Sequence, residues 1–299
     1  IMEKKLSIIS HKKAKSLVEK TAAMIFRGCA IISVLAVVTI TGYMIISGTP
    51  AIFKEGITGI LFSTTWAPTA AHPQYGIAYV ILTSIVGVFL AICIGVPIGL
   101  FTAINLAEIA PARLRKILKS AIELLAGIPS VVYGFFGMVV LVPAFRNIFG
   151  NGNCVFTASI LLGIMILPTI IGVSESAIRA VPDSYYEGSL GLGASHERSV
   201  FFAVLPAAKS GILAGIVLGI GRAIGETMAV VMVAGNQAII PDGMFSGVRT
   251  LTSNIVLEMG YATDLHREAL IATAVVLFIF ILIINLSLSL LNRRAEHAN

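Results

Sequence analysis

The sequence predicts an all-α membrane protein with about six transmembrane helices, on the evidence of its composition, its long apolar runs and the placement of its basic residues. Of the 299 residues, 57% are hydrophobic and only 12% are charged, and the mean hydropathy is +0.95. A soluble domain carries about 25% charged residues, so this chain has too little polar surface to enclose a soluble core. Its apolar segments also lack the alternation that is typical of β-barrel strands.

The first predicted transmembrane segment is residues 28–48, because a membrane-crossing helix needs about 20 mostly apolar residues. A basic N-terminal segment, residues 1–27, precedes it. The apolar run is too long for the core of a signal peptide, and no pattern of small residues that marks a cleavage site follows it. We therefore expect this segment to be a retained anchor.

Further spans are predicted beyond a mixed loop that carries aromatic residues typical of the membrane interface. They cover residues 77–104 (interrupted at Pro97), 124–145, 156–173, 210–234 and 269–291. Prolines and glycines inside a span are tolerated only where neighbouring helices or a cavity satisfy the backbone groups that they free. Because the third to fifth spans contain such residues, we expect a bundle with a pathway.

The basic residues predict the orientation, because cytoplasmic loops carry an excess of lysine and arginine. With six spans, both termini share a side with residues 113–119 and with the segment between spans four and five, where basic residues gather. The other side receives only Lys54, Arg146, Arg249 and Arg267. We therefore expect both termini to be cytoplasmic, with residues 292–299 as a cytoplasmic tail.

Motifs that would make the chain an enzyme are absent from the sequence. It contains no G-x-x-x-x-G-K-[ST] for ATP, no H-E-x-x-H for zinc and no G-x-S-x-G for acyl transfer. Its three cysteines form no C-x-x-C pair, which disfavours a metal site. The basic residues flank apolar spans, so topology explains them better than nucleic-acid binding does. We therefore expect no catalytic residue, no metal and no cofactor in this chain.

A polar segment at about residues 177–206 is predicted to form a short helix against the cytoplasmic face of the membrane. Ser184 and Glu187 have the spacing of a capping box, in which a hydroxyl and a carboxylate satisfy the exposed N–H groups of a first helical turn. Gly191 and Gly193 can adopt the left-handed conformation that ends a helix. The plain alternative is an ordinary surface helix that joins two spans.

The same segment resembles the EAA loop of permease subunits of type I ABC importers. The residues that match its spacing are Glu187, Gly188, Ser189, Gly193, Leu205 and Pro206. The sequence departs from the family pattern where Gly188 and Ser189 replace two alanines and Ala203 replaces the usual isoleucine, but these side chains remain small. The resemblance implies a type I ABC importer permease fold over residues 75–291 and a loop that docks on a separate ATPase subunit.

Two ionisable residues, Arg222 and Glu226, fall near the middle of the fifth predicted span. A charge there costs about 2.5–3.5 kcal/mol on insertion scales, so such residues usually mark a pathway. Four positions apart on one helix, the two side chains share a face and can pair. Gly211, Gly215 and Gly219 form a strip of small residues on nearly the same face, which predicts close helix packing there.

An arginine guanidinium suits a tetrahedral oxyanion, because its planar fork donates two parallel hydrogen bonds and keeps its charge. We therefore interpret Arg222 and Glu226 as residues of a substrate pathway. The alternative is a salt bridge inside the membrane that only orients helices.

Two stretches resemble phosphate-specific transport permeases of the Pst type: GRAIGETMAV at 221–230 and ELLAGIPSVVYGFFG at 123–137. The ending Thr227-Met228-Ala229 is similar to the PstC subunit. The resemblance implies a permease subunit of an ATP-driven phosphate importer in the bacterial cytoplasmic (inner) membrane. It implies as partners a homologous PstA-like permease, two copies of an ATP-binding subunit that hold ATP and Mg²⁺, and an extracytoplasmic phosphate-binding protein.

Other functions remain open on the sequence. One is a permease of the same class for another oxyanion, such as sulfate or molybdate, and another is the paired PstA-type subunit. A secondary transporter in which Glu226 carries a proton would show internal repeats with broken helices in matching positions, and we find none. A non-transporting scaffold would leave the buried Arg222 and Glu226 without a use.

Overall fold

The computed structural model describes residues 2–297, and the side chains of residues 19–287 and of Leu290. Helices follow one another along this chain, and the described β structure is a short antiparallel pair, β1 (Trp66–Ala67) with β2 (Gln74–Tyr75). Five helical segments are long and apolar enough to cross a membrane, and a pair of helices bent by 70° gives a sixth if it counts as one span. This confirms the predicted all-α fold with about six transmembrane helices.

The helices have the following bounds along the described chain. The α-helices are α1 (Met2–Glu55), α2 (Ile57–Phe62), α3 (Ala78–Ile104), α4 (Ala112–Gly127), α5 (Ser130–Phe136), α6 (Val142–Phe149), α7 (Val155–Arg179), α8 (Asp183–Gly191), α9 (His196–Ser199), α10 (Leu205–Ala207), α11 (Lys209–Gly225), α12 (Met228–Val233), α13 (Leu251–Glu258) and α14 (Asp264–His297). Turns of π-helix are η1 (Asn105–Ile109), η2 (Gly137–Leu141) and η3 (Val200–Val204).

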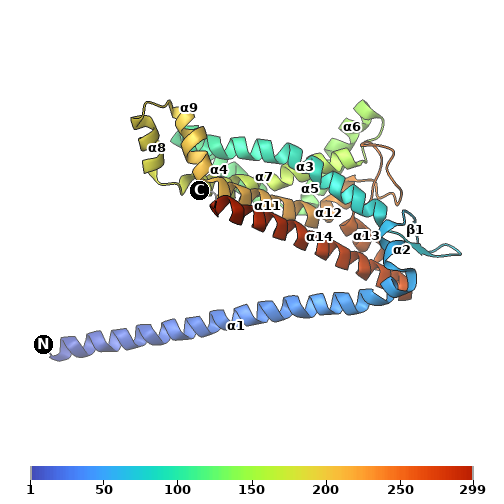
Figure 1. Cartoon of the computed structure of the whole chain (residues 1–299), viewed down its shortest axis with the longest axis horizontal. Helices are drawn as coiled ribbons and strands as arrows, with labels where there is room; N and C mark the ends of the chain where they lie inside the picture. Colours follow the sequence, from blue (N-terminus) through green and yellow to red (C-terminus); the bar gives the residue numbers. More distant parts are fainter. Residues whose placement is uncertain (1, 298–299) are drawn as a thin grey trace.

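Helix α1 contains the predicted span 28–48 and extends beyond it at both ends. It diverges from the bundle and meets it only near its C-terminal end (Figure 1). There Gly48 lies so close to α14 that an added Cβ would be 3.0 Å from the Cα of Ala272. The apolar side chains between Met24 and Ile46 are mostly exposed. A helix that is apolar all round belongs in lipid or against another protein.

The second span does not break at its proline. Helix α3 continues through Pro97 and into η1, so the predicted interruption is wrong. Glycines on either side of the proline let α3 lie directly on α7. A Cβ added at Gly95 or Gly99 would approach Ile166 or Ile170 to within 2.8 or 2.9 Å. Packing against a neighbouring helix can hold a proline-containing span in helical form.

The third span begins later than predicted. Helix α4 ends at Gly127, and Ile128 and Pro129 are extended, so the crossing segment is Ser130–Phe149 rather than 124–145. The residue before a proline is disfavoured in the helical conformation, which explains a break at Ile128. The hydroxyl of Tyr133 donates to the carbonyl of Leu125 at 2.8 Å and ties the two helices across the break.

The fifth span is also discontinuous. Helix α11 ends at Gly225, Glu226 has an extended backbone (φ −70°, ψ 127°), and α12 begins at Met228. The prediction of one helix over 210–234 is therefore wrong. Beyond α12 the chain turns at Gly235 and Asn236, both with positive φ, and an isolated bridge pairs Gly235 with Val248.

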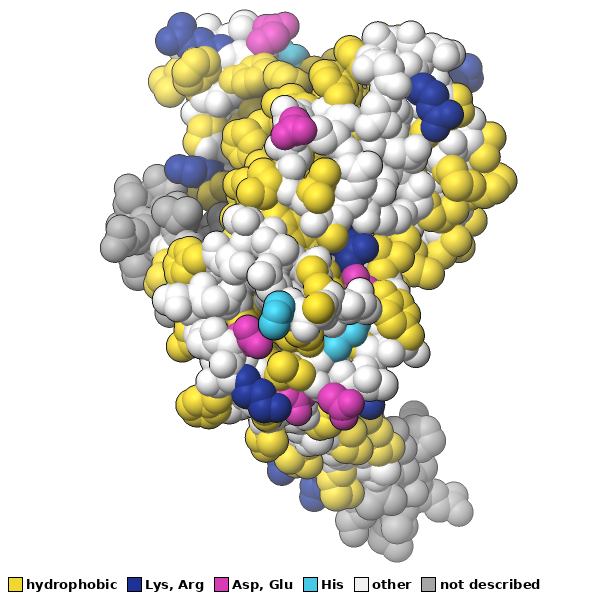
Figure 2. All heavy atoms as spheres, turned by 90° about the vertical axis from the view of Figure 1, so that its right-hand side faces the viewer, with side chains coloured by type: hydrophobic (Ala, Val, Ile, Leu, Met, Phe, Trp, Pro, Cys, Tyr) yellow, Lys and Arg dark blue, Asp and Glu magenta, His cyan; other side chains and the backbone are white. Residues whose placement is uncertain are grey.

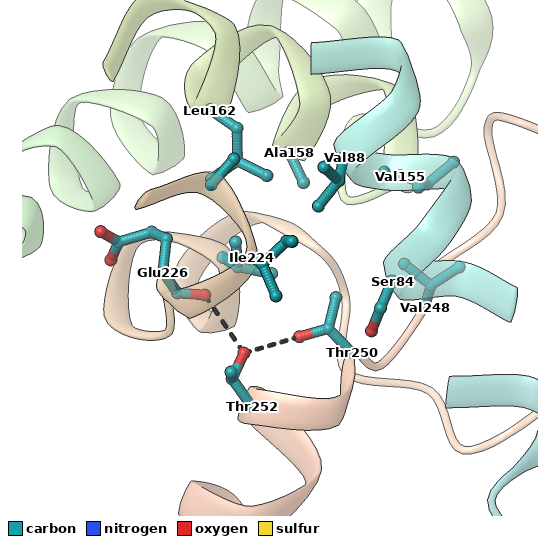
Figure 3. Close-up of a pocket in the computed structure, with 13 residues that line it drawn as sticks. Ser84, Val88, Val155, Ala158, Leu162, Ile224, Glu226, Val248, Thr250 and Thr252 are labelled. Carbon is teal, nitrogen blue, oxygen red and sulfur yellow. Dashed lines mark hydrogen bonds between the residues drawn. The ribbon is translucent and has the colours of Figure 1, made fainter. Parts of the chain in front are cut away.

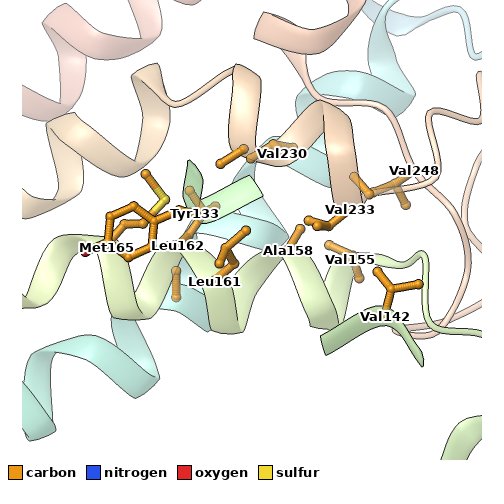
Figure 4. Close-up of a cluster of buried hydrophobic side chains, with 13 residues drawn as sticks. Tyr133, Val142, Val155, Ala158, Leu161, Leu162, Met165, Val230, Val233 and Val248 are labelled. Atoms are coloured by element: carbon orange, nitrogen blue, oxygen red, sulfur yellow. The ribbon is translucent and has the colours of Figure 1, made fainter. Parts of the chain in front are cut away.

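Helix α7 is the centre of the bundle and the most buried of the candidate spans. Its side chains form one cluster with those of α5, α6 and α12 (Figure 4). The labelled side chains of this cluster are Tyr133, Val142, Val155, Ala158, Leu161, Leu162, Met165, Val230, Val233 and Val248. On the end face viewed in Figure 2, hydrophobic side chains cover much of the surface, and basic, acidic and histidine side chains are scattered among them.

The two ends of the molecule differ in what they contain. One end holds α8 and α9 together with the N-terminal end of α1 and the C-terminal end of α14, and the other holds α2, β1 and α13 (Figure 1). Both chain ends therefore lie on the side of the predicted loop at 177–206. Residues 292–297 of the predicted tail continue α14, and the last two residues are outside the described part of the chain.

Candidate functional site

Arg222 and Glu226 lie on the two sides of the break between α11 and α12. Arg222 occupies the last turn of α11, Glu226 follows the helix end, and both side chains are half-buried. Because the helix stops at Gly225, Glu226 is not one helical turn beyond Arg222. The ion pairs that form within 4.0 Å among the described side chains do not include these two residues. The predicted pairing on one helix face is therefore wrong.

The carboxylate of Glu226 instead binds the next helix. Its Oε1 accepts a hydrogen bond from the backbone N–H of Ala229, in the first turn of α12, at 3.2 Å. An acidic side chain is favourable at a helix start, where N–H groups lack partners within the helix. Its backbone carbonyl accepts a hydrogen bond from the hydroxyl of Thr252 at 3.1 Å. Glu226 is thus held through both its side chain and its main chain.

A narrow cavity lies beside the break, between α3, α7, α11 and the start of α13 (Figure 3). Its polar lining consists of Glu226 and the hydroxyls of Ser84, Thr250 and Thr252, and apolar side chains line the rest. The cavity has a volume of about 20 Å³, which is room for a water molecule. In this conformation the cavity cannot hold an oxyanion such as phosphate.

The predicted glycine strip lies against α7. A Cβ added at Gly211 would be 2.3 Å from the Cβ of Ala177. At Gly215 and Gly219 the nearest atoms would be 3.1 and 2.8 Å away, on Ser174 and Ile170. Small side chains let two helix backbones approach in this way. The strip fixes α11, and with it the position of Arg222, against the centre of the bundle.

The loop at 177–206 forms two short helices, α8 and α9. Helix α8 begins at Asp183 with Pro182 before it, and no side chain caps its start, so the predicted capping box of Ser184 and Glu187 is wrong. Proline before a helix start already sets an extended entry. Gly193 has φ +88°, and its N–H donates to the carbonyl of Leu190 at 2.8 Å, as a helix-ending glycine does.

Side-chain hydrogen bonds hold α8 against α9. The hydroxyl of Ser199 donates to that of Ser189 at 3.0 Å, and the Tyr186 hydroxyl lies 2.8 Å from Nδ1 of His196. Ser189 stands where the EAA pattern has an alanine, and it takes part in a hydrogen bond that an alanine side chain could not form. Glu187 and Gly188 face solvent beside these contacts.

Large apolar side chains project from this end of the molecule. The exposed fraction is 93% for Leu192, 78% for Phe202 and 53% for Tyr185. Leu205 and Pro206 form the corner that follows, where η3 and α10 meet α11 at the 70° bend. Tyr185 and Leu192 lie outside the candidate spans, and exposed apolar side chains there are typical of an interaction surface.

An ionic network at the opposite end was not predicted. The carboxylate of Glu258, a residue that is only 6% exposed, pairs with Arg249. Its Oε2 also accepts from Nε1 of Trp66 at 2.9 Å and lies 2.8 Å from Nε2 of His266. Arg249 donates to the side chain of Asn254 at 3.0 Å. Trp66 lies 192 positions before Glu258, and the other residues come from one stretch that reads as a polar loop, so no local pattern indicates that they meet.

A second buried carboxylate lies at the α8 end of α7. Glu175, which is 4% exposed, pairs with Lys119 of α4 at 3.4 Å and with Arg179 at 2.9 Å. Arg179 also donates to the carbonyl of Leu106 at 2.7 Å. This network joins α4, α7 and η1.

The chain has clear relatives among known proteins. The family described as binding-protein-dependent transport system inner membrane component matches residues 95–297. The chain is 38% identical over 287 residues to the probable ABC transporter permease protein YqgH of Bacillus subtilis (strain 168), covering 93% of each chain. It is 36% identical over 240 residues to the phosphate transport system permease protein PstC of Pasteurella multocida (strain Pm70), covering 73% of this chain and 74% of the relative.

Solved structures share the fold. An inward-facing structure of the MetNI methionine ABC transporter aligns with a TM-score of 0.55 at 21% identity, over 74% of this chain and 94% of its own. A crystal structure of an amino acid ABC transporter with histidines gives a TM-score of 0.54 at 22% identity, over 73% and 92%. At these identities the likeness concerns the fold alone.

Proposed function

We propose that this chain, which belongs to the family of binding-protein-dependent transport system inner membrane components, is the permease subunit of an ATP-driven phosphate importer. The observation that carries the proposal is Arg222, half-buried in the last turn of a discontinuous membrane helix. The Glu226 carboxylate that follows it is bound to α12 instead. A relative at 36% identity is a phosphate transport system permease protein.

Arg222 has the chemistry that phosphate requires. Phosphate must lose water to enter a narrow site, and a fixed positive charge offsets part of that loss. The guanidinium fork matches two phosphate oxygens, and it stays charged at any physiological pH. Because Glu226 is bonded to Ala229, its carboxylate does not occupy the fork. A negative charge nearby would still limit how tightly the anion binds and so favour its release.

The exposed segment around α8 suits the coupling role. Glu187 is exposed on α8, and the same segment carries the exposed apolar side chains of Tyr185 and Leu192. A segment that exposes both a carboxylate and apolar side chains fits a cleft that offers a basic residue and apolar walls. In this proposal the cleft belongs to a separate ATPase subunit, present in two copies, which holds ATP and Mg²⁺.

The remaining partners follow from the same proposal. A homologous PstA-like permease would form the other half of the pathway. An extracytoplasmic phosphate-binding protein would deliver phosphate at the end that holds β1 and α13. The chain would lie in the cytoplasmic membrane, with both termini and α8 in the cytoplasm.

Uptake by the complete complex tests the function. The chain would be co-expressed with the partner permease, the ATPase and the binding protein, and reconstituted in vesicles. We expect uptake of labelled phosphate that requires ATP and falls to background with Arg222→Gln, while the complex still co-purifies. Arg222→Lys keeps the charge without the fork, so partial uptake would indicate a purely electrostatic role.

Competing anions and energy sources separate the alternative functions. Unlabelled sulfate or molybdate that competes better than phosphate would assign the chain to another oxyanion. Phosphate uptake driven by a proton gradient without ATP would make it a secondary transporter. Full uptake by the Arg222→Gln complex would remove Arg222 from the pathway.

A further inference from the structure

The first turn of α13 is fastened on one side to α3. The hydroxyl of Thr83 donates to the carbonyl of Arg249 at 2.6 Å, and the hydroxyl of Ser84 accepts from the N–H of Leu251 at 2.9 Å. Thr250 and Ser253 complete the start of the helix with a capping box. Each residue involved is buried or half-buried. The start of α13 is therefore a fixed point inside the bundle.

On its other side the same turn reaches the break in the fifth span. The hydroxyl of Thr252, a residue that is 8% exposed, donates to the carbonyl of Glu226 at 3.1 Å. Figure 3 shows the two residues joined across the cavity wall, with Thr250 beside them. Glu226 belongs to neither α11 nor α12, so its carbonyl lies outside the regular hydrogen bonding of both helices.

We infer that Thr252 is a positioning residue of the pathway, which fixes the break between α11 and α12 and thereby the placement of Glu226 relative to Arg222. A carbonyl without a partner in a dry interior is unfavourable, so the backbone turns to satisfy it. Thr252 supplies that partner from an element that is itself anchored to α3. The inference rests on the proposed transport function.

The other contacts of Glu226 and its neighbours do not orient the Glu226 carbonyl, so the Thr252 hydroxyl has this role. The Ala229 N–H holds the Glu226 side chain but not its carbonyl. Apolar contacts of Ile224 and Val230 set the distance between the elements without setting the direction of the peptide. A hydrogen bond is directional, so its loss lets the Glu226 peptide rotate and displaces Glu226 relative to Arg222, which α11 holds in place.

Three variants of the complete complex test the inference. Thr252→Val replaces the hydroxyl by a methyl group of similar size, and Thr252→Ser keeps the hydroxyl. Thr157→Val is the matched control, because Thr157 is also buried and donates to a backbone carbonyl, that of Gly152, at 2.6 Å, but it does not line the cavity beside the break. The readout is the number of phosphate ions transported per ATP hydrolysed, with thermal unfolding measured in parallel.

We expect Thr252→Val to lower this ratio about tenfold, the effect of leaving one buried acceptor unpaired. Thr252→Ser should keep the wild-type ratio. Thr157→Val should lower the unfolding temperature and leave the transport ratio unchanged. A Thr252→Val complex with the wild-type ratio would overturn the inference, as would a Thr252→Ser complex as impaired as the Val variant.

The experiment also holds if Thr252→Val does not fold. Thr252→Cys then carries the test, because its thiol is a weaker donor of similar volume. An intermediate ratio is expected, and a wild-type ratio overturns the inference. Absence of ATP-dependent phosphate uptake by the wild-type complex would instead refute the proposed function itself, so the two failures are distinguishable.

Discussion

At the scale of single residues, the important contrast is between a free guanidinium and a bound carboxylate. The fork of Arg222 forms no ion pair within 4.0 Å among the described side chains. The Glu226 carboxylate accepts the Ala229 N–H. Placing an arginine in a membrane span costs about 2.5–3.5 kcal/mol on insertion scales. No paired carboxylate offsets that cost here, which favours an anion as the partner of Arg222.

Substitutions at Glu226 separate its charge from its capping role. Glu226→Gln keeps an oxygen that can accept from Ala229 but removes the charge, so we expect normal membrane levels with impaired uptake. Glu226→Ala removes the acceptor as well and should lower stability by about 1 kcal/mol, as loss of a helix cap does. Uptake and thermal unfolding in detergent measure the two effects. Wild-type uptake by the Gln variant would assign Glu226 to capping alone.

The sequence indicates residue types better than residue partners. Arg222 and Glu226 could be selected because charge is rare in an apolar span. The partners of these two side chains depend on the helix break at Gly225, and no proline in the sequence indicates that break. Conversely, α3 and α7 contain Pro97 and Pro168 and continue through them. Apolar length predicts that a segment crosses, but tertiary packing decides where the backbone leaves the helix.

At the scale of elements, α11 packs closely on α7 through its glycines, on the helix that carries Arg222. Gly211→Val would place a Cβ where the Ala177 side chain lies, 2.3 Å from its Cβ. We expect this overpacking to lower stability by about 1–3 kcal/mol. Gly221→Val is the matched control on the same helix, because an added Cβ there meets nothing within 4 Å. Thermal unfolding of both variants in detergent measures the difference, and equal losses would show that the contact does not matter.

Helix α8 carries the second prediction at this scale. Glu187→Lys reverses a charge that faces solvent on α8, and like charges across an interface repel. We expect the variant complex to lose most of the ATP hydrolysis that the binding protein stimulates. The residue is exposed, so the isolated permease should keep its thermal stability. Co-purification reports assembly, and normal stimulated hydrolysis with normal uptake would remove Glu187 from the coupling role.

The ionic networks at the two ends show what sequence analysis misses at this scale. Glu258, Arg249 and His266 come from a stretch that reads as a polar loop, yet Glu258 is buried and bonded to Trp66 near the start of the chain. Burial of a charge depends on partners from distant segments. Periodicity and motifs describe neighbours along the chain, so they cannot reveal such partners.

At the scale of the whole molecule, both chain ends and α8 lie at one end (Figure 1). We expect that end to be cytoplasmic, because the basic residues gather there. Ser195→Cys in α8–α9 should resist an impermeant thiol reagent added outside sealed cells. Ala70→Cys, at the exposed turn between β1 and β2, should react. Both would be placed in a chain lacking the exposed Cys29 and Cys93. The reverse labelling pattern would invert the topology.

The contact between Trp66 and Glu258 has a consequence for the order in which the protein matures. The two residues are 192 positions apart, and His266, which shares the carboxylate, comes later still. The strand pair β1–β2 is therefore synthesised long before its partners exist. Helices α3 and α7 can pack against each other earlier, but the contact of Trp66 with Glu258 and His266 can form only once the chain has been made as far as the start of α14. The end of the bundle that holds β1 and α13 can therefore complete its packing only late in synthesis.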